Sequence, residues 1–438
     1  MVRGWPRSAL YALCMGAVAF AFAEGVARLA TRVSPDNGMP AVGPMPLLPY
    51  RPDPAAVHDW IDQVGRATYL VLDPELGWTV LPGGRTPDGQ YEANAQGARA
   101  PASRFYASTP PHGTVRMVTV GDSFTHGDGV SNSETWEARL EEARADLEVV
   151  NLGVGGYGTD QAFLRWRRDG RGLAAHFAIL GLWPENVCRN LNVVRYFLAP
   201  NSGYGSKPRF VLESGALRLV GVPVLAGESL VTAVTAPERS AALREDYWMI
   251  ADDVQPKWWY GLRLARAVAS TATLYHRHAI RNRLYAGDDP SGIDLTVAIA
   301  EAFSDEASQA GAAPLVLVIP MRELLATYPD EGALPLTRAL RARGLDVLDF
   351  GPTVTRVVRE KGEAWCFQRD GHLTAACNQL LASWLIERLS PRLDAIKDGA
   401  LRPELERSNG LVAHKAPPLA EHARHGARSE WPDIRRAM

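Results

Sequence analysis

The sequence predicts an α/β protein built on a doubly wound, parallel, five-stranded sheet, on the strength of two observations. Short runs rich in Val, Ile and Leu occur at residues 115–120, 148–152, 176–182, 314–319 and 345–350, and segments of helical composition separate them. Strands that are apolar throughout, instead of alternating, are typical of a sheet covered on both faces. The carboxyl ends of such strands share one edge, where open α/β sheets place their sites.

Bulk composition fits one large domain with extensions and excludes some functions. The chain has 438 residues, 46% hydrophobic and 22% charged, with a formal net charge of -2. This charge provides no basic field for nucleic acid, so no nucleic-acid partner is expected. The four cysteines form no CxxC pair and have no His at ligand spacing. We therefore expect no structural zinc site, and the reaction that the motifs below imply requires no metal or organic cofactor.

The N-terminus carries a targeting pattern. Arg3 and Arg7 precede an uncharged run at 8–23, and apolar residues continue beyond it. Residues 1–32 are predicted to be an uncleaved signal anchor, long enough to span a membrane. A small-x-small sequence at 21–23 leaves a cleaved signal peptide open, and a cytoplasmic amphipathic helix is a third interpretation. The first two place the rest of the chain outside the cytoplasm.

Residues 33–112 are predicted to be a linker and an N-terminal extension. The part at 33–60 is rich in proline and is expected to be stiff, holding the body away from the bilayer. Short strand-like pieces at 69–106 are expected to pack on the main domain.

The main domain is predicted at 113–392, and a mobile tail at 393–438. The strand and helix alternation stops at about 195–290, which indicates an insertion that could cap the active site. Ser214-Gly215 is a plausible hairpin turn inside it. An aromatic group follows that could stack on sugars but is more typical of a core: Tyr247, Trp248, Trp258, Trp259 and Tyr260.

Two motifs follow the first two predicted strands. In Gly121-Asp122-Ser123, a serine at a strand-to-helix turn exposes its hydroxyl near the positive end of the next helix. The glycine-rich string 151–158 includes Gly156 and lets a backbone N–H approach a substrate oxygen. It lacks the residues of a P-loop and the spacing of a dinucleotide fingerprint.

Two further motifs complete the set. Asn186 follows the third strand and can donate from its amide to the same oxygen, although Asn190 and Asn192 are close by. Asp370-Gly371-His372 precedes an apolar helical pattern. His372 can take a proton from Ser123, and a carboxylate can orient its ring.

These four blocks resemble the SGNH/GDSL hydrolase family over roughly residues 116–388, and their wording is similar to bacterial envelope members. The resemblance implies an SGNH-like, flavodoxin-like sandwich with Ser123 as nucleophile, His372 as base and Asp370 as its orienter. It also implies an oxyanion hole formed by the N–H groups of Ser123 and Gly156 and by the side chain of Asn186.

The sequence departs from the family pattern in two blocks. The usual last block is Asp-x-x-His, whereas Asp370 is two residues before His372 and Arg369 stands at minus three. The usual Asn-Asp of the third block is Asn186-Val187. A Ser-His dyad helped by a backbone carbonyl is therefore open as well.

The expected activity is ester hydrolysis through an acyl-enzyme, with O-acetyl esters of extracytoplasmic carbohydrate as first choice and lipid or small-molecule esters as second. A polysaccharide O-acetyltransferase is an alternative. So is a non-catalytic carbohydrate-binding or assembly protein working with envelope polysaccharide machinery.

The cysteines leave one structural question open. Cys366 and Cys377 bracket His372, and Cys188 follows the third block. One disulfide near the site, or three separate buried thiols, both fit the spacing.

Overall fold

A five-stranded parallel sheet forms the centre of the molecule. The computed structural model describes residues 7–33, 39–43, 45–48, 51–249, 261–328 and 334–397. The strands lie in the order β12-β11-β8-β6-β7. They are β6 (Val115–Val120), β7 (Leu147–Asn151), β8 (Phe177–Leu182), β11 (Ala313–Val318) and β12 (Val347–Asp349). Numbered along the chain, this is the doubly wound order 2-1-3-4-5, so the predicted fold class is confirmed.

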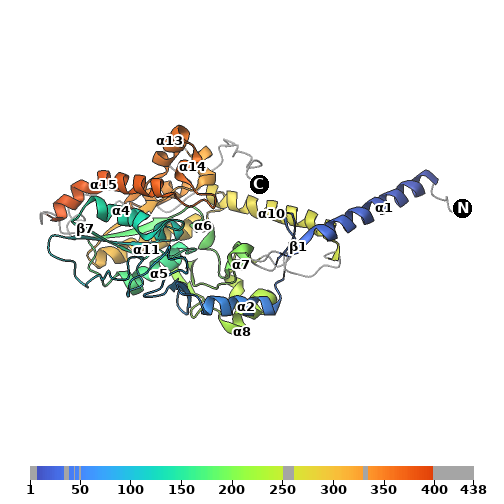
Figure 1. Ribbon diagram of the computed structural model, residues 1–438, viewed down its shortest axis with the longest axis horizontal. Helices are drawn as coiled ribbons and strands as arrows, with labels where there is room; N and C mark the ends of the chain where they lie inside the picture. The colour runs from blue at the N-terminus through green and yellow to red at the C-terminus, as the bar shows by residue number, and fades with distance from the viewer. Residues whose placement is uncertain are drawn as a thin grey trace.

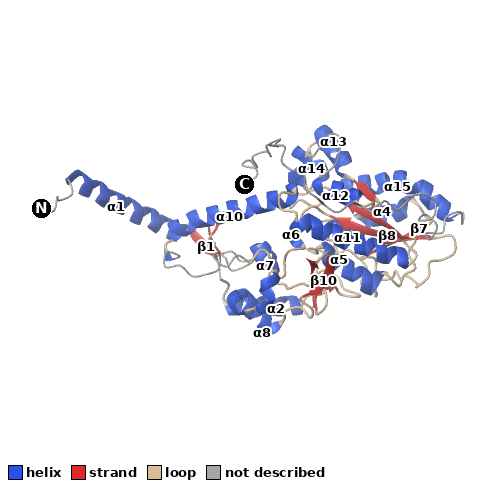
Figure 2. Cartoon of the chain, turned by 180° about the vertical axis from the view of Figure 1, so that it is seen from behind, coloured by secondary structure: helices blue, strands red, loops and turns tan. Residues whose placement is uncertain are grey.

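Helices cover both faces of the sheet (Figure 2). One face packs against α4 (Trp136–Ala143), α13 (Gly351–Lys361) and α15 (Ala375–Lys397); the other packs against α5 (Thr159–Arg165), α11 (Ser291–Gln309) and α12 (Pro335–Ala342). Within β6, Val115 and Met117 belong to the first core, whereas Val118 and Val120 belong to the second. Because neighbouring residues point to opposite faces, burial on both sides requires the continuous apolar runs seen in the sequence.

The N-terminal helix α1 (Arg7–Ala30) projects from the body and meets α10 (Arg263–Ala286) at its C-terminal end (Figure 1). Glu24 accepts hydrogen bonds from the backbone N–H groups of Arg263 (2.8 Å) and Leu264 (2.9 Å), which begin α10. A carboxylate at a helix N-terminus satisfies donors that have no partner inside the helix. The stretch Ser8–Ala30 is long and apolar enough to cross a membrane.

The proline-rich stretch predicted as a stiff linker contains regular structure. Three short strands pair there, and a helix follows: β1 (Thr31–Val33), β2 (Pro40–Val42), β3 (Met45–Pro46) and α2 (Pro54–Gly65). Asp53 caps α2 by accepting a hydrogen bond from the Ala55 N–H at 2.9 Å. Pro54 starts this helix because a first-turn residue needs no N–H donor and its fixed φ suits the turn. This proline therefore begins a helix where the sequence indicated a spacer.

The extension continues with the antiparallel pair β4 (Leu70–Asp73) and β5 (Gly77–Val80), which packs on the main domain as predicted. The shorter elements near the sheet are α3 (Ser123–His126), α6 (Asn186–Arg189), α14 (Glu363–Cys366) and the helical turns η1 (Asn132–Glu134), η2 (Trp166–Gly170) and η7 (Arg322–Thr327).

The insertion contains α7 (Arg195–Leu198), η3 (Pro200–Ser202), β9 (Arg209–Glu213), β10 (Ala216–Val220), α8 (Gly227–Thr235), η4 (Pro237–Arg239) and η5 (Ala241–Glu245), and α10 completes it. The predicted hairpin is confirmed, with Ser214 and Gly215 both at positive φ in its turn. Trp248 is buried and donates its indole N–H to the Cys188 carbonyl at 2.9 Å, as expected for a core aromatic. Trp258, Trp259 and Tyr260 lie outside the described residues.

The last helix extends further than the sequence indicated. α15 continues to Lys397, five residues beyond the expected domain end at 392, and residues 398–438 of the predicted tail lie outside the described residues. Leu393 is buried against the sheet, which explains why the helix persists there.

Candidate active site

Ser123 begins α3 directly after β6, at the carboxyl edge of the sheet. Asp122 caps this short helix: its side chain accepts a hydrogen bond from the Phe124 N–H at 2.9 Å. Gly121 allows the tight turn, because a Cβ there would lie 2.1 Å from the Thr125 hydroxyl and 2.8 Å from the Gly181 carbonyl. The strand end, the cap and the glycine thus fix the position of Ser123.

The reactive groups of Ser123 are uncommitted. Among the described residues, neither its hydroxyl nor its backbone N–H has a hydrogen-bond partner. The residue is 4% exposed. A nearly buried hydroxyl and N–H without internal partners are available to a bound substrate.

The glycine-rich block after β7 lies against this turn. A Cβ at Gly153 would be 2.3 Å from the His126 amide nitrogen, so only glycine permits this approach. Gly156 has a φ of +81° and lies beside the Trp78 ring. Its N–H makes no hydrogen bond to any residue that the structure describes. Gly156 can therefore supply the second backbone donor that the sequence predicts.

Asn186 follows β8 and joins three blocks through its side chain. Its Nδ2 donates to the Asp122 carboxylate (3.2 Å) and to the Tyr157 carbonyl (3.1 Å), and its Oδ1 accepts from the Trp183 N–H (2.7 Å). Arg189 donates to the same two acceptors at 3.3 and 3.0 Å. Both amide hydrogens of Asn186 thus have acceptors inside the protein. Donation to an oxyanion requires one of these contacts to be exchanged for the substrate.

The two neighbouring asparagines have other roles. Asn190 accepts from the Thr159 N–H at 2.8 Å and donates to the Thr296 hydroxyl at 2.8 Å. Asn192 donates to Asp246 at 3.0 Å, within the insertion. Of the three candidates from the sequence, Asn186 is the one that contacts the serine block.

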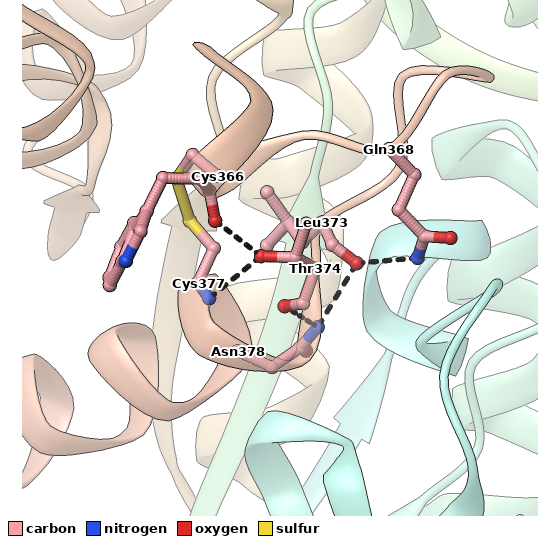
Figure 3. Close-up of a disulfide and its surroundings, with 7 residues drawn as sticks. Cys366, Gln368, Leu373, Thr374, Cys377 and Asn378 are labelled. Atoms are coloured by element: carbon pink, nitrogen blue, oxygen red, sulfur yellow. Dashed lines mark hydrogen bonds between the residues drawn. A yellow bond between two sulfur atoms is a disulfide. The ribbon is translucent and has the colours of Figure 1, made fainter. Parts of the chain in front are cut away.

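A disulfide holds the segment that carries His372 (Figure 3). Cys366 and Cys377 are bonded, which decides the question that the sequence left open, whereas Cys188 is a buried free thiol. Inside the loop, the Thr374 N–H donates to the Cys366 carbonyl at 2.9 Å and the Gln368 N–H donates to the His372 carbonyl at 2.8 Å. The loop is therefore a small closed unit with His372 near its tip.

The His372 ring lies between two carboxylates and above the serine turn. Its Nδ1 is 3.0 Å from Asp370 Oδ2, and its ring centroid is 5.3 Å from that of Phe124, the residue next to Ser123. Its Nε2 is 4.0 Å from Asp128 Oδ2. The Asp370 contact assigns a proton to Nδ1, which leaves the Nε2 lone pair free to accept a proton.

Asp370 fits the role of orienter in spite of its altered spacing. It also accepts a hydrogen bond from the His372 backbone N–H at 3.1 Å. Partial burial raises the pKa of this carboxyl, but the hydrogen bonds from His372 outweigh it and hold the pKa below its ordinary value. Asp370 is thus ionised at neutral pH, as an orienting carboxylate must be.

The sequence analysis missed a second histidine and carboxylate beside the site, His126 and Asp128. His126 Nδ1 contacts Asp128 Oδ1, and His126 Nε2 lies 2.7 Å from the Tyr69 hydroxyl. Burial, followed by the charge of Arg99, holds the pKa of His126 below its ordinary value. The signal was present: Asp128 stands only five residues after Ser123 along the chain.

The described residues contain no group of three or more His, Cys, Asp or Glu side chains able to hold a metal ion. The chemistry available from the residues present is proton transfer and nucleophilic attack, with hydrogen-bond donors for a developing negative charge.

All four blocks lie at the carboxyl edge of a sheet with the order 2-1-3-4-5, with Ser123 and Asn186 on either side of the switch between β6 and β8. The chain has a doubly wound α/β fold with a flavodoxin-like strand order.

No protein-family model and no curated protein matches this chain. Similar solved structures include a member of the lipolytic protein G-D-S-L family from Veillonella parvula, with 10% identity and a TM-score of 0.32, over 63% of this chain and 99% of that one. A catalytic mutant of an acetylxylan esterase from Geobacillus stearothermophilus has 10% identity and a TM-score of 0.34, over 64% and 95%. An α/β hydrolase enzyme from the metagenome of Lake Arreo has 14% identity and a TM-score of 0.34, over 64% and 97%.

Proposed function

We propose that this chain is a serine-dependent ester hydrolase that acts through an acyl-enzyme on O-acetyl esters of extracytoplasmic carbohydrate. The observation that carries the proposal is the convergence at one sheet edge of three groups that have no hydrogen-bond partner among the described residues: the Ser123 hydroxyl, the Ser123 N–H and the Gly156 N–H. The His372 ring lies beside them, oriented by Asp370.

In this mechanism the Ser123 hydroxyl attacks the ester carbonyl carbon while His372 Nε2 accepts its proton. The carbonyl oxygen becomes an oxyanion, which the Ser123 and Gly156 N–H groups stabilise together with the positive end of α3. His372 then gives the proton to the leaving alkoxide oxygen. In the second half, water attacks the carbonyl carbon of the acyl-serine while His372 Nε2 takes a proton from the water. The bond to Ser123 Oγ then breaks, His372 returns this proton to Oγ, and free Ser123 and acetic acid, which ionises to acetate, result.

The proposed setting is the outside of a bacterial membrane. The support is the apolar helix Ser8–Ala30, preceded by Arg3 and Arg7 in the sequence. Acylated envelope polysaccharide is then the substrate within reach of an anchored body. Protease treatment of intact spheroplasts tests this: the proposal expects degradation of the body, and full protection contradicts it.

The serine assignment is tested with p-nitrophenyl acetate and a fluorophosphonate probe. Ser123→Ala should lower turnover by on the order of a millionfold and abolish labelling, because the nucleophile is lost. Ser133→Ala is the matched control, since Ser133 is an exposed serine in η1, outside the site. Wild-type turnover by Ser123→Ala would overturn the assignment.

An O-acetyltransferase uses the same acyl-enzyme and differs only in whether a sugar hydroxyl replaces water. Acetate release measured with and without an oligosaccharide acceptor separates the two reactions. A second candidate, a non-catalytic carbohydrate-binding or assembly protein, is favoured by the Asn186 amide, whose hydrogens both have internal acceptors. Absence of fluorophosphonate labelling in the folded wild-type protein would favour that candidate.

A further inference from the structure

A pocket of about 400 Å³ is lined by the N-terminal extension and the catalytic domain, and not by the insertion that the sequence suggested as a cap. One of its lining residues, Asp128, has its Oδ2 4.0 Å from His372 Nε2. The extension supplies Tyr69 and Tyr91, and the catalytic domain supplies His126, Asp128 and Gly155. Gly155 precedes Gly156, the proposed oxyanion donor. The pocket therefore begins where an ester bound at Ser123 would continue.

Asp128 is held at this junction by both its backbone and its side chain. Its N–H donates to the Ser123 carbonyl at 2.9 Å, and its Oδ1 contacts His126 Nδ1. His126 Nε2 in turn lies 2.7 Å from the Tyr69 hydroxyl. With Asp128 ionised, the consistent proton arrangement has His126 donating from Nδ1 and accepting from the tyrosine at Nε2.

The second oxygen of Asp128 faces the site without a hydrogen bond. Within the described part of the chain, the basic side-chain nitrogen near it is His372 Nε2 at 4.0 Å, beyond hydrogen-bond distance. The side chain is 26% exposed and lines the pocket. A Cβ at position 155 would lie 3.0 Å from this oxygen, so Gly155 leaves the space in front of it open.

The distance between Asp128 Oδ2 and His372 Nε2 determines which group of the substrate Asp128 can contact. During acylation Nε2 must come within hydrogen-bond distance of the leaving alkoxide oxygen, to protonate it. An acceptor 4.0 Å from Nε2 then reaches a hydroxyl on the carbon next to the ester, because the oxygens of a vicinal diol are close neighbours. An ionised carboxylate accepts such a hydrogen bond strongly.

We propose that this pocket binds the alcohol part of the ester, with Asp128 Oδ2 accepting a hydrogen bond from the hydroxyl adjacent to the acylated oxygen. The preferred substrates are then monoesters of vicinal polyols, such as partly acetylated sugars. Tyr69 and Tyr91 line the pocket and offer apolar contact for the carbon skeleton. The proposal rests on the function proposed above and specifies its leaving group.

The test compares two acetates that differ by the hydroxyl alone, trans-2-acetoxycyclohexanol and cyclohexyl acetate. For each enzyme variant we measure the ratio of kcat/KM for the first to that for the second, so that the intrinsic reactivity of the esters cancels between variants. Asp128→Asn should lower this ratio about 10- to 100-fold, the effect of removing a hydrogen bond to a charged group.

Gly155→Ala provides an independent variant, because its methyl group would crowd Asp128 Oδ2, and it should lower the same ratio. Asp59→Asn is the matched control: Asp59 is exposed in α2 and is not among the residues that line the pocket, so the ratio should stay at the wild-type value. Thermal melting of each variant verifies that it is folded.

An unchanged ratio in both Asp128→Asn and Gly155→Ala overturns the inference. So does an equal fall of both substrates in Asp128→Asn, which indicates a general effect on His372. These outcomes differ from failure of the proposed function, in which Ser123→Ala hydrolyses both acetates at the wild-type rate.

Discussion

Replacing both disulfide cysteines, Cys366→Ala with Cys377→Ala, should destabilise the protein and loosen the loop that carries His372. The bond closes a loop with a sequence separation of 11 residues. The chain-entropy relation for a loop of about 12 residues gives about 3 kcal/mol of stabilisation at 25 °C. For a folded unit of about 300 residues, this corresponds to a fall in Tm of about 5 °C.

The loop keeps several hydrogen bonds without the disulfide, including Thr374 N–H to the residue 366 carbonyl. We therefore expect the double variant to fold and to retain activity at 25 °C. Its activity should fall at a lower temperature than that of wild type, because the closed loop opens more readily.

Thermal melting and the temperature dependence of p-nitrophenyl acetate hydrolysis measure these effects, with Cys14→Ala as the control, since Cys14 is an exposed free thiol in α1. Addition of a reductant should move wild type toward the double variant and leave the variant unchanged. A double variant with the wild-type Tm would refute the entropic reasoning, and a Tm loss without earlier inactivation would refute the link to His372.

Three other predictions concern the site. Asn186→Ala should lower kcat by about 100- to 1,000-fold if the amide turns to the oxyanion during reaction. A loss of less than tenfold in steady-state kinetics would show that Asn186 only holds the neighbouring loops together and does not stabilise the oxyanion. Gly156→Ala should lower the free energy of unfolding by about 1–2 kcal/mol, because its φ of +81° is unfavourable for a residue with a Cβ; an unaltered midpoint in urea unfolding contradicts this. The pKa of Asp370 is lower in the folded state than in the unfolded state, so its ionised form stabilises the fold. This contribution should be fully present above about pH 4, near the unfolded pKa, and should be lost as pH falls through the lower folded pKa. The stability difference between wild type and Asp370→Asn should therefore be constant above about pH 4 and shrink below it, and a difference that grows on acidification contradicts this sign.

The described structure also shows where sequence patterns mislead. Pro54 lies in a run that is typical of a stiff linker, but Asp53 before it caps a helix that packs against α8. Proline occurs both in extended linkers and in the first turn of helices. Whether such a segment forms a helix depends on whether its apolar face packs against another part of the protein. The end of the domain shifted for the same reason, since Leu393 in α15 is buried.

The sequence alone determined the sheet and the identity of the four blocks. Continuous apolar runs specify strands covered on both faces, and short motifs such as Gly121-Asp122-Ser123 follow those strands directly. These are local properties, in which neighbours along the chain suffice to decide the outcome.

Tertiary structure alone decided the surroundings of these blocks. It brought Tyr69 to His126 across 57 residues, placed Asp128 beside His372, and directed both hydrogens of the Asn186 amide to partners inside the protein. Such contacts join elements that are far apart in the sequence, and no sequence pattern predicts which of their residues will meet. Only the packing of the extension against the sheet edge creates the pocket and determines which carboxylate faces it.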